Sequence, residues 1–189
     1  MTKSIYNILH LIIMSILLMI MSVQSLSGQT INFSVHVASS LDATKDADMA
    51  FPQVMAGDGI TAIGLGDGGM GIFAISGNEE LDVEVTLVAP TNLVHVSYPA
   101  QTMPLNLTFA YANYGVNDIN QAKTATGNTA RFQMKERQSG PAGAPPTPPS
   151  SGHTPQIVTA YLYVYGTIDV GMIASGAYSG TVDLYVQYY

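Results

Sequence analysis

The most specific chemical motif in the chain is a spacing of three glycines. Gly64, Gly66 and Gly69 fit the GxGxxG pattern of a dinucleotide-binding loop. Asp82 and Glu84 follow near the distance at which an acidic residue binds the ribose. Such a site also needs a helix that begins at the loop, because the helix N-terminus holds the pyrophosphate. The apolar residues directly after the loop are typical of a strand, so the sequence favours a glycine turn between two strands.

Acidic side chains are the next candidates, because clustered carboxylates can bind calcium. The aspartates concerned are Asp42, Asp46, Asp48, Asp58 and Asp67. Their spacing does not fit an EF-hand loop, and no glutamate closes such a loop. We interpret them as solvated loop carboxylates with turn roles, with an opportunistic surface calcium site as the alternative. The adjacent Glu79 and Glu80 are interpreted as solvated turn residues, not as a general acid and base.

The histidines show no metal-ligand spacing. His36 and His95 are expected on the polar faces of two separate strands, and His153 lies in a proline-rich stretch. Neither GxSxG nor HExxH occurs. The sequence leaves open a Ser-His-Asp triad assembled from distant strands, although no motif points to one. We therefore expect a protein that is not an enzyme and has no catalytic residues, no cofactor and no metal site.

The N-terminal residues predict export. Lys3 is followed by an apolar run over residues 11–21 and then by the small residues of SVQSLSG, which is the order of a secretory signal peptide. The run is shorter than the roughly 20 apolar residues of a membrane-spanning helix, which is the alternative. We expect cleavage of residues 1–28 and a single mature domain over residues 29–189. No further transmembrane segment is expected, and the mature chain is placed outside the cell, on its surface or in the periplasm.

Composition narrows the possible partners of the mature chain. The sequence has 13 acidic and 6 basic residues, and it contains no cysteine. An acidic, sparsely charged chain does not fit nucleic-acid binding, which needs clustered Lys and Arg. Without cysteine, the fold has no disulfides and the protein cannot carry a lipid on an N-terminal cysteine.

The rest of the sequence is organised around its C-terminal end. Residues 176–189 alternate, with Val182, Leu184, Val186 and Tyr188 on one face, as in a strand with one buried face. Residues 157–172 are also strand-like. A short glycine-containing connection separates the two segments, so we expect a hairpin at the heart of the sheet.

Short apolar runs with turn residues between them recur along the mature chain. No helical period is sustained after the signal, so we expect an all-β fold, a single antiparallel immunoglobulin-like β-sandwich of about eight to ten strands. Residues 39–48 and 113–128 are expected to form loops. Residues 136–156 hold six of the ten prolines and are expected to form a proline-rich loop insertion. The remaining strands are expected at residues 30–37, 50–55, 60–63, 70–75, 81–88, 93–97, 105–111 and 130–134.

Three stretches resemble a known bacterial family. They are AFPQVMAGDGIT, GIFAISGNEELDVEVTL and YGTIDVGMIASGAYSGTVDLYVQYY, the last with Gly176, Tyr178 and Gly180 in a Gly-x-Tyr-x-Gly pattern. The chain resembles the domain of unknown function 4402 family, exported proteins of Gram-negative bacteria that are similar to spore-coat-U and fimbrial subunits. The resemblance implies a pilin-like β-sandwich in a cell-surface or extracellular setting, and it implies no known catalytic residues.

Two functions follow as expectations. The first is a secreted or cell-surface structural or adhesive protein, in the form of a fimbria-like subunit. The second is an extracellular module that binds a glycan or another ligand through exposed tyrosines or loop carboxylates. For the first function, Ile31, Phe33, Val35 and Val37 form an apolar comb that could complete the sheet of a neighbouring subunit. The alternative is that the comb is the first strand of its own sandwich, which the intact C-terminal hairpin favours.

Overall fold

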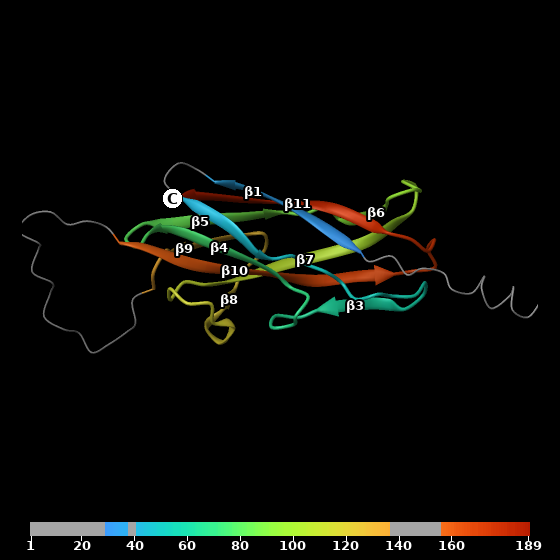
Figure 1. The fold of residues 1–189 in the computed structure, drawn as a ribbon, viewed down its shortest axis with the longest axis horizontal. Coiled ribbons are helices and arrows are strands. Elements are labelled where there is room, and N and C mark those ends of the chain that lie inside the picture. The colour runs from blue at the N-terminus through green and yellow to red at the C-terminus, as the bar shows by residue number, and fades with distance from the viewer. Residues whose placement is uncertain (1–28, 38–40, 137–155) are drawn as a thin grey trace, which may run out of the picture.

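The computed structural model describes residues 29–37, 41–136 and 156–189. In these residues the chain is built almost entirely of β-strands, with a single 3₁₀ turn at Ile119–Gln121 (Figure 1). The strands are β1 (Thr30–Val37), β2 (Asp42–Ala47), β3 (Gly59–Ile63), β4 (Gly71–Asn78), β5 (Asp82–Val88), β6 (Asn92–His95), β7 (Thr102–Ala112), β8 (Lys123–Thr124), β9 (Thr129–Gln133), β10 (Ile157–Val170) and β11 (Tyr178–Tyr188). The all-β prediction is confirmed.

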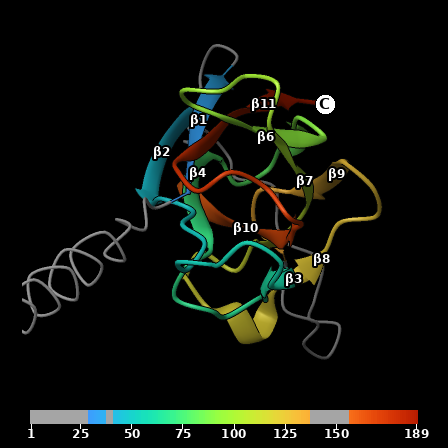
Figure 2. The same ribbon diagram turned by 90° about the vertical axis from the view of Figure 1, so that its right-hand side faces the viewer.

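The strands form two layers that share one strand. In the first layer β11 lies between β1 and β5, β9 lies outside β5, and β6 follows β5 along the same edge of β11. In the second layer β10 pairs with β3, β4 and β7, while β2 lies outside β4 and β8 outside β7. The first residues of β7 pair with β6 and the later ones with β10, so β7 connects the layers (Figure 2).

The core lies between the two layers. On β11 the predicted alternation is confirmed, because Val182, Leu184 and Val186 are buried and the residues between them are not. Leu162 and Val164 of β10 are also fully buried. Burial of these apolar faces is the main favourable contribution to folding in a chain without disulfides.

The central position of β10 places unusual demands on its residues. Tyr163 is buried together with its neighbours on both sides, and its hydroxyl donates to Asn117 Oδ1 at 2.7 Å. The loop after β7 therefore covers the outer face of the sheet at this point. Further along, a Cβ on Gly166 would lie 2.1 Å from the carbonyl oxygen of Asn106, so only glycine lets β7 approach this closely.

The predicted C-terminal hairpin is wrong. β10 and β11 are both long strands, as expected, but they lie in different layers and do not pair with each other. The connection over residues 171–177 crosses between the layers. Alternation shows which face of a strand is buried, but it does not identify the neighbouring strand, and a short connection can cross between layers as well as form a hairpin turn.

Three further expectations differ from the structure. The expected loop over residues 39–48 contains β2. This polar strand lies at the edge of the second layer, where most of its side chains are exposed to solvent. The expected strand over residues 50–55 is irregular, although Phe51 is buried there and Met49 just before it. The structure has eleven strands in its described residues, more than the eight to ten expected. The predicted signal peptide and most of the proline-rich stretch lie outside the described residues.

No helix in the described residues is long and apolar enough to cross a membrane.

Candidate functional site

The candidate site is the place where β1 pairs with the edge of β11 and packs on the core, and we call this place the groove. β1 pairs with β11 in parallel register, from Thr30 beside Ser179 to Val37 beside Val186. Every other pairing among the described strands is antiparallel. β1 has no paired strand on its other edge within the described residues. It is therefore an edge strand, and in the described residues it is attached to the sheet along one side only.

Apolar side chains of β1 fill the space between the two layers. Ile31 is buried, and the half-buried Phe33 and Val35 pack on the core. The Phe33 ring meets the edge of Phe73 with 5.0 Å between centroids and 68° between planes, which is a favourable aromatic geometry. The side chains of β1 therefore belong to the core, although the strand lies at the margin of the sheet.

Gly71 lies directly against the Phe33 ring. A Cβ on Gly71 would lie 3.4 Å from both Phe33 Cζ and Met49 Cβ, which is ordinary van der Waals contact, so the backbone at Gly71 packs closely between two apolar side chains. We call the seat formed by Met49, Gly71 and Phe73 the Phe33 socket. All three residues come from the second layer or from the segment that leads to it, so Phe33 holds the two layers together.

The end of β1 marks one end of the whole sandwich. Val37 lies beside Val186, close to the end of β11, and the Tyr188 hydroxyl near that end accepts from the Asn78 N–H at 2.8 Å. β2 begins at the same end, where Asp42 pairs with Ser76. We call this the β11 end of the sandwich. Figure 1 shows β1 and β11 running together towards it, with the C-terminus there.

The predicted glycine turn is confirmed. The loop with Gly64, Gly66 and Gly69 connects β3 to β4, and no helix follows it. Asp67 Oδ2 accepts from the Gly64 N–H at 2.6 Å, which closes the turn. A Cβ on Gly69 would lie 2.6 Å from the Ala50 carbonyl oxygen, so this glycine serves close backbone packing. The pattern belongs to strand geometry and not to a nucleotide site.

The candidate carboxylates have structural roles and do not converge. Asp58 Oδ2 accepts from the Met55 N–H at 2.6 Å, a turn role like that of Asp67. Asp48 forms an ion pair with Lys45 on the surface, and Glu79 forms one with Lys135. Among the described residues, no group of three or more His, Cys, Asp or Glu side chains could hold a metal ion.

The prediction that His95 lies on a polar face is wrong. Its side chain is 4% exposed and shares the buried face of β6 with Leu93. Nδ1 accepts from the N–H groups of Ser97 and Tyr98, each at 3.0 Å. This assigns the proton to Nε2, which lies 3.2 Å from the Ser175 carbonyl oxygen. The imidazole is a structural link between the β6–β7 turn and the connection before β11.

The residues around His95 are fitted to it. The ring meets Tyr178 edge-on with 5.0 Å between centroids, and the Tyr178 hydroxyl donates to the Ala174 carbonyl oxygen at 2.9 Å. Burial raises the pKa of Tyr178. Gly176 has a φ of 151°, and a Cβ there would lie 2.2 Å from His95 Nε2. The Gly-x-Tyr pattern of the sequence therefore packs against a histidine that sequence reasoning placed elsewhere.

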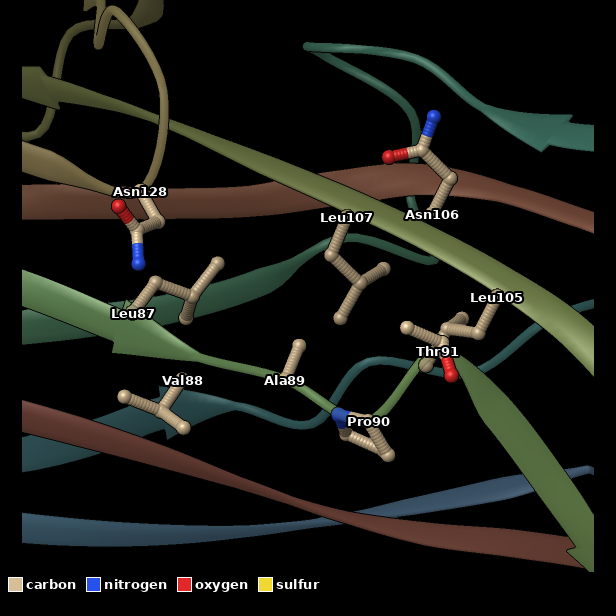
Figure 3. Close-up of a pocket in the computed structure, with 9 residues that line it drawn as sticks. All are labelled: Leu87, Val88, Ala89, Pro90, Thr91, Leu105, Asn106, Leu107 and Asn128. Carbon is tan, nitrogen blue, oxygen red and sulfur yellow. The ribbon is translucent and has the colours of Figure 1, made fainter.

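A small pocket opens where β7 leaves the first layer (Figure 3). It has a volume of about 260 Å³ and is lined by residues such as Leu87, Pro90, Leu105 and Leu107. Its size lies just below the range of roughly 300–1,000 Å³ typical of small-molecule sites. None of its lining residues is titratable. The pocket lies between β7 and the end of β5 with the connection that follows it, and it offers no group for acid–base chemistry.

The outer face of the first layer carries a row of polar side chains. Glu84 accepts from Arg131 Nε at 2.5 Å and from Gln187 Nε2 at 3.0 Å. The hydrogen bond from Arg131 lowers the pKa of Glu84 and raises that of Arg131. The guanidinium also lies 3.6 Å from the centroid of the Tyr189 ring. These partners satisfy one another on an exposed surface, where such pairs contribute little to stability.

The exposed tyrosines do not form one binding platform. Tyr98 lies in the turn after β6, beside the first residues of β11, whereas Tyr185 and Tyr189 lie near the last residues of that strand. The predicted ligand-binding alternative relied on exposed tyrosines or loop carboxylates, and these tyrosines are divided between the two ends of β11.

Sequence reasoning missed the Phe33 socket and the His95 link. Period-two alternation identified the inward face of β1, but Gly71 and Met49 come from other segments, and only the fold brings them to Phe33. A glycine at the start of an apolar strand was the one available signal, since glycine in a strand often marks a close approach.

Comparisons with known proteins were made for sequence and for structure. No family model and no curated protein matches the chain. A solved structure to which this chain is similar is the CooA pilin subunit from enterotoxigenic Escherichia coli, at 12% sequence identity and a TM-score of 0.34. The match covers 79% of this chain and 97% of that chain.

Proposed function

We propose that the protein is an exported structural subunit of a bacterial surface assembly, fimbria-like in kind, whose copies join by exchanging β1. The observation that carries this proposal is the attachment of β1. Within the described residues, β1 is a strand with one apolar face that is paired along one edge only, and it runs parallel to β11. The predicted signal peptide and the resemblance to the domain of unknown function 4402 family support an exported setting.

Exchange of β1 conserves the contacts that it makes. A β1 from a second copy would bring the same Ile31, Phe33 and Val35 into the same groove, so the exchange needs no contact surface that the single chain lacks. Exchange of an identical element is a low-cost route to association for this reason. Without β1, the edge of β11 would present unpaired N–H and C=O groups and an open core, which is a template for another strand.

A labelled peptide tests whether the groove accepts β1 from outside. A fluorescent peptide of residues 29–37 is mixed with the mature chain in urea near the unfolding midpoint, and the urea is then removed. We expect the peptide to elute with the folded protein on gel filtration. A matched peptide with Phe33→Asp should elute alone, because the Phe33 socket does not accept a carboxylate. Equal retention of both peptides, or of neither, would contradict the proposal.

The location of the protein is tested separately. Mass spectrometry of the exported protein should give an N-terminus between Leu26 and Thr30, and antibodies should label the surface of intact cells. A chain that keeps Met1 and stays in the cytoplasm would exclude a role in a surface assembly.

A further inference from the structure

The parallel direction of β1 determines which ends of two copies can meet. β1 runs towards the β11 end of the sandwich and finishes with Val37 beside Val186. The sandwich to which it is attached resumes at Asp42, which lies at that same end beside Ser76. The strand therefore leaves and rejoins its own molecule at one end.

The chain between β1 and β2 limits how far a donor can lie from an acceptor. Five peptide steps separate Val37 from Asp42, since only residues 38–41 lie between them. At 3.3–3.6 Å per residue these steps span at most about 18 Å. A copy that donates β1 in the parallel register must place its own Asp42 within that reach of the acceptor's Val186. The β11 ends of the two copies must then face each other.

An open, head-to-tail chain needs a different arrangement. The donor's Asp42 would have to lie at the opposite end of the acceptor's groove, near Ser179, where β1 begins. A strand of eight residues is about 26 Å long at 3.3 Å per residue. This exceeds the reach of the connection. Only an antiparallel insertion, which would turn β1 around in the groove, would bring the donor to that end.

We propose that exchange of β1 joins two copies of this chain in a closed pair, with their β11 ends together. This inference rests on the proposed function. In each copy, the donated β1 leaves from the β11 end, and the β1 accepted from the other copy also finishes at the β11 end. The two copies therefore use the same surface, and the contact is isologous. Each copy fills the groove of the other, no groove stays open, and growth stops at two copies.

Paired cysteines can report the direction of β1 in a chain that has none of its own. Asn32 and Thr181 are exposed partners across β1 and β11. Neighbouring strands are about 4.8 Å apart, which is within the Cα separation that a disulfide bridges. Because both side chains point away from the core, Asn32→Cys and Thr181→Cys leave the groove intact.

The experiment mixes two single-cysteine mature chains of different mass. An affinity-tagged Asn32→Cys chain and an untagged Thr181→Cys chain are refolded together at high concentration and oxidised. We expect a disulfide-linked heterodimer. Thr44→Cys in place of Thr181→Cys is the control, since Thr44 is exposed on β2 and should link only by random collision. The double variant Asn32→Cys/Thr181→Cys should give a species of two chains and nothing larger on a non-reducing gel.

The other outcomes separate the two proposals. A ladder beyond two chains, or faster linking of Asn32→Cys to Tyr185→Cys, would show an open or antiparallel assembly and overturn the closed pair. Exchange of β1 would still stand in that case. The remaining outcome is that the single-cysteine chains do not link above the control and that the double variant forms its disulfide within one chain. In that case β1 remains paired with the β11 of its own chain. That result would overturn both the closed pair and the proposed function.

Discussion

Truncation of Phe33 tests how β1 is held to the sandwich. The Phe33 ring lies in the socket of Met49, Gly71 and Phe73, between the two layers. In Phe33→Ala the socket is empty, β1 loses its largest apolar contact, and the backbone pairing with β11 remains. The change therefore isolates the contribution of one side chain to the attachment of the strand.

The expected loss of stability follows from the burial of the ring. A fully buried Phe→Ala substitution costs about 3–5 kcal/mol, and Phe33 is half-buried, so about 2 kcal/mol is expected from burial. The edge-on contact with Phe73 adds about 0.5–1.5 kcal/mol. The sum of about 3 kcal/mol is a large part of the roughly 5–15 kcal/mol that stabilises a typical domain.

Urea unfolding of the mature chain at low protein concentration measures this loss. With a slope of about 2–3 kcal/mol per molar urea, the midpoint of Phe33→Ala should fall by about 1 M. Ser34→Ala is the control, because Ser34 follows directly on the other face of β1 and should change stability by no more than about 0.5 kcal/mol. If both variants unfold at the same urea concentration, Phe33 does not anchor β1 and the socket has been misassigned.

Three further predictions concern the core, one tyrosine and one glycine. Val186→Asp should lower stability by about 4 kcal/mol or more, because it buries an unpaired carboxylate. Gln187→Asp, on the exposed face of β11, should lower stability only slightly. Equal melting temperatures of the two variants would show that the register of β11 is wrong. Burial, with a smaller contribution from the Asp118 charge, raises the pKa of Tyr163 to about 12. The unfolded chain loses this proton first, so the contribution of Tyr163 to stability should be constant below pH 10 and fall as the pH rises from 10 to 12. Tyr163→Phe should reduce that fall, and an unchanged pH profile between pH 10 and 12 would contradict the burial of the hydroxyl. Gly176→Ala should displace the His95 ring and lower the melting temperature by several degrees. Ala177→Gly, at the next residue, should have a much smaller effect. Similar melting temperatures of the two variants would show that Gly176 and His95 are not in contact.

Local alternation predicted much of the fold because it depends only on neighbouring residues. The strand at residues 30–37 and the inward face of β11 follow from side chains that alternate along a pleated backbone. The glycine turn before β4 could be distinguished from a nucleotide loop for the same reason, since the residues after it have strand periodicity. What these patterns fix is the burial of each face.

Strand partners could not be predicted, because they depend on residues far apart in the sequence. The connection between β10 and β11 looks like a hairpin turn, yet it crosses between layers, and the edge strand β2 is too polar to show a buried face. The burial of His95 follows from backbone N–H groups of the turn after β6, which no side-chain pattern reveals. The candidate site also depends on residues far apart in the sequence, because the parallel pairing of β1 and the Phe33 socket form only when both layers are assembled.

The mass of the mature chain in solution tests the exchange of β1 most directly. The chain is unfolded, refolded at protein concentrations from low micromolar to several hundred micromolar, and examined by sedimentation velocity. Exchange predicts a shift from one to two chain masses as the refolding concentration rises, and Phe33→Asp should suppress the two-chain species under conditions in which it still folds. A wild-type chain that sediments as a single copy at every concentration would contradict the account.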